Sequence, residues 1–256
     1  MTGKTRDQML EELAAGVKLL RDGGSSDDLD VQFYVPDTRL AGVVAGLTAY
    51  LKQTKPTKQE QQQAGNWLEQ LAFLAFSGLA GHERIESFNS AGPQIDLLAM
   101  GSGSSWIWLC ASLHVDTAKR GMLVECKARA TRVDDQDFGR FCSLMRGQEQ
   151  SVGLGIFLTL MGATGFPTLG KVEKKVYASR LRQVLYFARY GTPVVVLDWA
   201  DCQELLKPGG LVRILRAKVE NVEKLPCEVG ATPLAAIPLP KHLRRLVPGG
   251  GAITAR

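Results

Sequence analysis

The chain has 256 residues, of which 45% are hydrophobic and 22% charged, with a net charge of +5 and a pI of about 9.0. This hydrophobic content is enough for a folded core and argues against disorder, and no apolar run reaches the ~18 residues of a membrane-spanning helix. The five cysteines are scattered and the three histidines lack ligand spacing, which argues against a disulfide framework and a structural zinc site. The N-terminus does not resemble a signal peptide, so we expect a cytoplasmic protein without a membrane partner.

The first 60 residues are predicted to form a small helical extension. Residues 6–21 carry apolar side chains at helical spacing, which favours an amphipathic helix. We then expect an acidic loop at 25–28, a short strand or extended segment at 31–35 and a second helix at 38–52.

The central part of the chain alternates apolar runs with helical patterns, which predicts an α/β fold with a mixed central β-sheet flanked by helices. The predicted elements are a helix at 64–79, strands at 82–88, 94–101, 106–113 and 121–129, a helix at 134–145, a strand at 153–160, a helix at 168–190, a strand at 193–198, a short helix at 203–206 and a last strand at 211–215. After Pro226 the chain is rich in Pro and Gly and is predicted to be irregular. We therefore divide the chain into an N-terminal extension (1–60), a core (61–218) and a C-terminal tail (219–256).

The segment 121–128 is predicted as a buried strand that carries a glutamate and a lysine two residues apart. Because side chains alternate across a strand, Glu125 and Lys127 share one face of it. Burying charge is costly unless the groups are paired or bind a metal. The pattern therefore indicates either a structural ion pair or an active site.

Two further acids interrupt apolar elements. Asp96 lies near the start of a predicted strand, and Glu69 is the only charged residue in the apolar part of the helix predicted before it. Each has a structural alternative, because Asp96 can cap a turn and Glu69 can pair with Arg84. Together with Glu125 and Lys127, the acids indicate a metal-dependent hydrolytic site.

Asp96 followed by Glu125-Cys126-Lys127 resembles the Asp…(Asp/Glu)-x-Lys signature of the PD-(D/E)xK nuclease superfamily, which has the restriction-endonuclease-like fold. The order of elements is most similar to the Mrr-like branch. In that branch, a helix that opens with the pattern Gly-x-x-apolar-Glu precedes the core strands, and the segment Gly65-Asn66-Trp67-Leu68-Glu69 fits this pattern. A later apolar strand of the branch ends in threonine, as the run ending at Thr159 does here. The resemblance covers about residues 60–210 and implies a site at one edge of the sheet.

Two features depart from the family pattern. Pro93 and Asp96 are three residues apart instead of adjacent, and the span between Asp96 and Glu125 is long enough to hold the additional predicted strand at 106–113. This span makes Asp116 a reserve candidate for the acidic partner, although its neighbours are typical of a turn.

The resemblance implies an endonuclease that hydrolyses DNA and depends on Mg²⁺, which Mn²⁺ can replace. Asp96, Glu125 and the backbone carbonyl of Cys126 would bind the ion, and Glu69 would contact it directly or through water. Lys127 would orient the attacking water or accept its proton. The family further implies a role in restriction or antiviral defence, as a homodimer or as a subunit of a defence complex.

Basic residues near the proposed site are the candidates for contact with DNA. Arg129 and Arg132 follow the Glu-x-Lys strand, and Lys171, Lys174 and Lys175 form a later cluster. The structural alternative for this later cluster is the solvated face of a helix. Two other functions remain open, a repair or junction-resolving nuclease of the same fold and a non-catalytic nucleic-acid-binding subunit. No sequence-reading module is recognised, so the specificity is not predicted.

Overall fold

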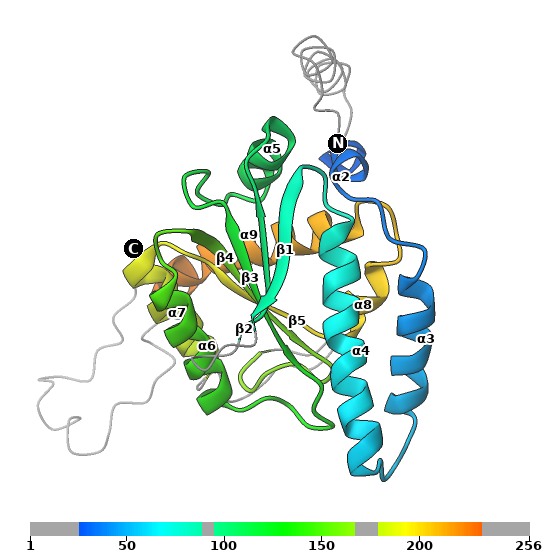
Figure 1. Ribbon diagram of the computed structural model, residues 1–256. Coiled ribbons are helices and arrows are strands. Elements are labelled where there is room, and N and C mark those ends of the chain that lie inside the picture. The colour runs from blue at the N-terminus through cyan, green and yellow to red at the C-terminus, as the bar shows by residue number, and fades with distance from the viewer. Residues whose placement is uncertain (1–25, 89–94, 167–178, 232–256) are drawn as a thin grey trace, which may run out of the picture.

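In a computed structural model, which describes residues 26–88, 95–166 and 179–231, the chain forms a five-stranded sheet between layers of helices (Figure 1). The strands, in both chain order and spatial order, are β1 (His82–Phe88), β2 (Ile95–Gly101), β3 (Gly121–Lys127), β4 (Val152–Thr159) and β5 (Val194–Leu197). Neighbours among β1, β2 and β3 are antiparallel, whereas β4 and β5 run parallel to β3. The predicted α/β class with a mixed central sheet is confirmed.

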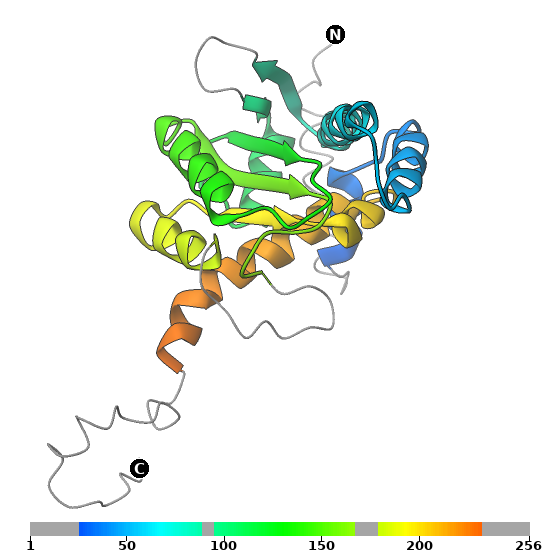
Figure 2. The same cartoon turned by 90° about the horizontal axis from the view of Figure 1, so that it is seen from below.

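The helices cover both sides of this sheet. They are α2 (Ser26–Phe33), α3 (Leu40–Leu51), α4 (Lys58–Ser77), α5 (Ser104–Ser112), α6 (Asp135–Gly147), α7 (Ser179–Tyr190), α8 (Trp199–Glu204) and α9 (Gly210–Ala231). In both views α6 and α7 lie on the opposite side of the sheet from α3 and α4 (Figures 1 and 2). Each side has its own hydrophobic cluster.

The alternation of side chains along β3 separates these two clusters. Met122, Val124 and Cys126 belong to the cluster that includes residues of α4 and α9. Leu123 belongs to the cluster of α6 and α7. Glu125 and Lys127 alternate in the same sense as Leu123, so they lie on the α6 side of the strand. The charged pair therefore sits at the end of an otherwise apolar layer.

The helix that carries Glu69 begins earlier than predicted, at Lys58 instead of residue 64. Thr57 Oγ1 accepts a hydrogen bond from the Glu60 backbone N–H at 3.3 Å, and Glu60 Oε2 accepts one from the Thr57 N–H at 2.7 Å. This reciprocal capping box satisfies two backbone donors of the first turn and fixes the start of the helix. The division predicted at residue 60 falls inside α4.

The predicted strand at 106–113 is wrong, because residues 106–112 belong to α5 and Leu113 is its C-cap. Trp106, Leu109, Cys110 and Leu113 are buried, and their spacing of three, one and three residues is that of a helix face. Trp108, between them, is 53% exposed. A short and continuous apolar run hides this period, which explains the error.

The predicted last strand at 211–215 is also wrong, because α9 begins at Gly210. Its buried residues include Leu211, Leu215, Val219 and Val222, which repeat at helical spacing over a length that a five-residue window does not reach. The helix continues through Pro226 to Ala231, so the irregular tail predicted after Pro226 does not begin there. The division predicted at residue 218 falls inside this helix.

α2 takes the place of the predicted acidic loop from residue 26 on and of the first three residues of the strand predicted at 31–35. Val31 and Val35 are 41% and 64% exposed, so the alternation that favours a strand there has no buried face to serve. Tyr34 forms only an isolated bridge with Leu79, and its hydroxyl donates to the carbonyl oxygen of Leu205 at 2.6 Å. The segment is held by α9 and its preceding loop instead of by the sheet.

Of the other predicted helices and strands, some are present in the structure and some lie outside the described residues. The helix at 38–52 and the other core elements are present close to their predicted bounds, with α7 beginning at Ser179 in the part described. The exception is the short helix predicted at 203–206, because α8 begins four residues earlier, at Trp199, where the Asp198 side chain caps it. The predicted helix at 6–21, residues 168–178 of the long predicted helix and the end of the tail lie outside the described residues. Among the helices that are described, none combines the length and apolarity needed to cross a membrane.

Candidate functional site

The carboxylate of Asp96 joins β2 to β3 at the point where their ladder ends. The last backbone pair of that ladder is Leu97 with Val124, so Asp96 and Glu125 are the next residues on the two strands. Asp96 Oδ2 accepts a hydrogen bond from the backbone N–H of Cys126 at 2.7 Å. Asp96 thus accepts a hydrogen bond from a backbone N–H at the strand end. This bond holds the Asp96 carboxylate beside the Glu-x-Lys segment.

Glu125 and Lys127 are in contact with each other at the same end of β3. Lys127 Nζ lies 2.6 Å from Glu125 Oε1, and the Glu125 side chain is 5% exposed against 26% for Lys127. The backbone partner of Glu125 on the neighbouring strand β4 is Phe157. The ring of Phe157 contacts that of Phe138 in α6, with centroids 5.6 Å apart. The carboxylate is therefore enclosed by apolar side chains on its inner side and by the ammonium group on its outer side.

Burial raises the pKa of Glu125 above its ordinary value of 4.5. The hydrogen bond with Lys127 opposes this shift, the negative charge of Asp96 reinforces it, and the charges of Lys127 and Arg140 oppose it. A buried carboxylate beside a second carboxylate is a place where an added cation would be stabilising. The same two acids would repel one another in its absence.

Glu69 approaches this region from the other side of the sheet. The Sγ of Cys126 lies 3.9 Å from the carbonyl oxygen of Leu68, so α4 packs on β3 at the residue before Glu69. The pKa of Glu69 is raised by partial burial and then by the charge of Asp96, whereas Lys127 lowers it. The structure thus brings the predicted acids and the lysine to one end of the sheet.

The structural alternatives for these residues have different outcomes. The ion pair of Glu125 with Lys127 is formed. Arg84 contacts Glu86 at 2.5 Å, so it serves a neighbour on its own strand instead of Glu69. Asp116 is a turn residue, because its Oδ1 accepts from the Ala118 N–H at 2.9 Å and its carbonyl accepts from the Lys119 N–H at 3.0 Å. It precedes the start of β3, at the opposite end of the strand from Glu125.

The donor set suits Mg²⁺ in part. Asp96 and Glu125 supply hard carboxylate oxygens from two adjacent strand ends, and Mg²⁺ is commonly bound by one or two carboxylates with several retained waters. Across residues 26–88, 95–166 and 179–231, no three His, Cys, Asp or Glu side chains are grouped to hold a metal ion together. Because Glu69 comes from the α4 side and Glu125 lies on the α6 side, contact of Glu69 through water is the arrangement that agrees with this geometry.

The basic residues proposed for DNA contact are placed unequally. Arg129 Nη2 lies 2.6 Å from Asp137 Oδ2 and Arg129 Nη1 lies 3.6 Å from Asp134 Oδ2, so α6 already engages this guanidinium. Arg132 is partly exposed in the loop after β3. The predicted cluster of Lys171, Lys174 and Lys175 lies outside the described residues.

Sequence reasoning missed Arg140, an exposed residue of α6 whose charge acts on Glu125. The helix buries Phe138, Phe141 and Met145 against the sheet. That spacing was visible in the sequence and fixes which flank of the helix carries Arg140. What the sequence did not provide is the side of the helix on which β3 lies.

Comparison of the chain with family models, with curated proteins and with solved structures finds no match. The resemblance to the PD-(D/E)xK superfamily therefore depends on the motif residues and on where they lie in this structure. These are the contacts of Asp96 with Cys126 and of Glu125 with Lys127.

The raised pKa of Glu125 predicts a pH dependence of stability. A carboxyl group whose pKa is higher in the folded than in the unfolded state favours folding at low pH, and this contribution is lost as the pH rises from about 4.5 through the raised value. We expect the free energy of unfolding of the wild-type protein to fall relative to that of Glu125→Gln as the pH rises above about 4.5. Denaturant unfolding of both proteins across this range measures the difference.

The matched control for this comparison is Glu204→Gln, which removes an exposed glutamate that also contacts a lysine, Lys207, at 2.8 Å. If the free energy of unfolding of the wild type instead stays constant or rises relative to that of Glu125→Gln as the pH increases, the Glu125 carboxylate is not penalised in the fold.

Proposed function

We propose that the chain is a Mg²⁺-dependent endonuclease of the restriction-endonuclease-like fold, which hydrolyses DNA phosphodiester bonds in restriction or another defence against foreign DNA. The observation that carries the proposal is the meeting of Asp96 with Glu125 and Lys127 at the adjacent ends of β2 and β3. Two acids and a lysine from two strands converge there beside a third acid of α4. A purely structural ion pair requires neither Asp96 nor Glu69 at that place.

The chemistry of the reaction explains why such residues are needed. The scissile phosphate is anionic and repels a hydroxide, and further negative charge develops on the leaving oxygen. Bound Mg²⁺ would lower the pKa of water and neutralise charge in the transition state. Asp96, Glu125 and the carbonyl of Cys126 would hold it, with Glu69 contributing through water. The backbone hydrogen bond that Asp96 accepts from Cys126 fixes the direction of one of these carboxylates.

Lys127 is the group of the chain that would act on the attacking water. Its ammonium is partly exposed and reaches Glu125 Oε1 from the open side of the strand end. A water at that place would meet both the ammonium and the two carboxylates. Lys127 would orient this water or accept its proton.

One observation favours a structural role for the charged pair, which would leave the chain a binding protein without catalysis. The contact of Lys127 with Glu125 is already closed at 2.6 Å, as in an ion pair that only stabilises the strand. In that case the charges would serve the fold, and removal of Lys127 would change stability without any loss of a metal-dependent reaction.

The proposal is tested by nicking of supercoiled plasmid in Mg²⁺, in Mn²⁺ and in EDTA. The wild-type protein should nick the plasmid only with metal, and Lys127→Ala should be at least about a hundredfold slower, since a positioned proton-transfer group contributes about that much. Lys207→Ala is the matched control, because Lys207 also contacts a glutamate but is 60% exposed and belongs to the segment after α8.

Nicking retained by Lys127→Ala would assign the activity to a different centre. If the wild-type protein binds DNA but does not nick it in either metal, the non-catalytic role replaces the nuclease.

A further inference from the structure

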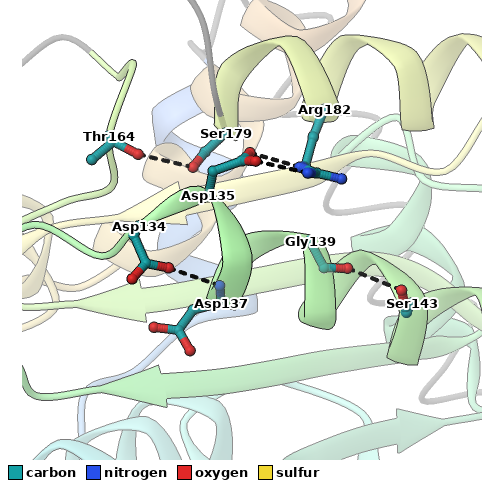
Figure 3. Close-up of polar contacts among 8 residues, drawn as sticks. All are labelled: Asp134, Asp135, Asp137, Gly139, Ser143, Thr164, Ser179 and Arg182. Atoms are coloured by element: carbon teal, nitrogen blue, oxygen red, sulfur yellow. Dashed lines mark hydrogen bonds and ion pairs between the residues drawn. The ribbon is translucent and has the colours of Figure 1, made fainter.

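Helix α6 has two flanks that face different parts of the molecule. Its buried residues Phe138, Phe141 and Met145 pack on the sheet above β4. On one flank, Asp135 forms two hydrogen bonds with Arg182 of α7, at 2.6 and 2.7 Å (Figure 3). Because α7 contacts β5, which lies beyond β4 in the sheet, this flank faces away from β3.

The other flank of α6 faces the end of β3. At 100° per residue, Asp137 and Arg140 lie on the side of the buried stripe opposite to Asp135. Figure 3 shows the Asp137 carboxylate directed away from the pair of Asp135 with Arg182. Asp137 contacts Arg129, two residues after the end of β3, at 2.6 Å. Arg140, one helical turn further on, therefore lies toward Glu125, and its positive charge acts on that carboxylate.

The acidic side chains at the start of α6 are all engaged by other groups. Asp134 accepts a hydrogen bond from the Asp137 backbone N–H at 3.0 Å and caps the helix. Asp135 is bound by Arg182 and Asp137 by Arg129. Within the described ranges of the chain, Arg140 forms no ion pair, and it is exposed. It is a cation beside the site whose hydrogen-bonding groups are available to an anion.

Building on the proposed nuclease function, we infer that Arg140 contacts a backbone phosphate of the bound nucleic acid, next to the phosphate that would be cleaved beside Asp96 and Glu125. A guanidinium group presents a planar set of donors that matches phosphate oxygens in a bidentate contact. Arg140 can make this contact without giving up an ion pair. Arg129 would first have to release two carboxylates.

The test is the salt dependence of binding to a short DNA duplex in EDTA, where cleavage cannot consume the probe. We expect Arg140→Gln to weaken binding about tenfold at low salt and to reduce the slope of log affinity against log salt by about 0.9, the value for one phosphate contact. In plasmid cleavage with Mg²⁺, the variant should show a raised KM with kcat within about threefold of wild type, as expected when a substrate-binding contact is lost.

The matched control is Arg146→Gln, an exposed arginine of the same helix that lies six residues further along and on the flank shared with Asp135. It should bind and cleave DNA as the wild type does. Circular dichroism and melting of each variant confirm that the helix is intact.

An unchanged salt slope for Arg140→Gln would overturn the inference, as would a wild-type protein that does not bind the duplex. An unchanged slope together with a shifted pH profile of cleavage would also overturn it, because Arg140 would then act only through Glu125. Failure of the nuclease function gives a different result, namely DNA binding that depends on Arg140 without any metal-dependent cleavage.

Discussion

Asp96→Asn is expected to slow DNA cleavage at least about a thousandfold while the protein stays folded. The asparagine keeps a side-chain oxygen that can accept the Cys126 N–H hydrogen bond, so the join between β2 and β3 is preserved. What is lost is the negative charge, and with it one of two carboxylates that would hold Mg²⁺. Charge stabilisation by a metal ion contributes several kcal/mol to such reactions, and each 1.4 kcal/mol or so is about a factor of ten in rate.

A measurement of metal binding distinguishes this cause from a damaged fold. Mg²⁺ that binds the native state stabilises it and so raises the melting temperature. At a hundred times the Kd, the gain in the free energy of unfolding is about 2.7 kcal/mol. We expect this gain for the wild-type protein and its loss for Asp96→Asn, while the melting temperatures without metal stay close. Initial rates of plasmid nicking, measured over a range of Mg²⁺ concentrations, complete the comparison.

Asp116→Asn is the control that the chain itself provides. Asp116 is the acid in the connection between β2 and β3, and its side chain serves a turn at the far end of β3. This variant should cleave DNA and respond to Mg²⁺ as the wild type does. If Asp116→Asn is inactive and Asp96→Asn is active, the acidic partner of Glu125 has been assigned to the wrong residue.

The fold was predictable where each element has a period or a length that only one structure satisfies. α4 and α6 are 20 and 13 residues long and bury apolar residues at helical spacing, over a length that no strand of this sheet reaches. α5 and the start of α9 were not predictable in this way, because a run of five to eight apolar residues fits either structure. Their buried residues show the helical period only when burial is known.

The candidate site was predictable at the level of its motif and less so at the level of its geometry. Glu125 and Lys127 share a face because of strand alternation alone, and Asp96 joins them because β2 pairs with β3. Alternation also puts Cys126 toward α4, which is why Glu69 reaches the site from the other face. The approach of Arg140 depends on the packing of α6 beside α7, which no local pattern in the sequence encodes.

The same limit applies to the link between the N-terminal helices and the rest of the fold. Asp30 of α2 is fully buried, and its two carboxylate oxygens accept hydrogen bonds from Arg216 of α9 at 2.7 and 2.6 Å. The Arg216 side chain is 16% exposed. The partners are 186 residues apart in the chain. The residues of α3 and α4 share one hydrophobic cluster with those of α9, so this ion pair lies against a continuous core.

Asp30→Ala is expected to lower the free energy of unfolding by about 3–5 kcal/mol, because the largely buried charge of Arg216 would lose the two hydrogen bonds to the Asp30 carboxylate. Replacing both residues, as Asp30→Leu with Arg216→Met, should restore much of the loss, since apolar side chains of similar volume avoid the cost of burying the charges. Denaturant unfolding of the wild type, the single and the double variants measures both effects.

A surface pair of the same kind is the control for this last experiment. Arg39 Nη2 and Asp37 Oδ2 are 2.7 Å apart, but the Arg39 side chain is 67% exposed and stays hydrated when its partner is removed. Asp37→Ala should therefore change stability far less than Asp30→Ala. If both variants lower the free energy of unfolding only slightly, α2 opens without unfolding the sheet, and the N-terminal helices are a separate cooperative unit. If Asp30→Ala alone lowers it strongly, these helices unfold together with the sheet that carries the candidate site.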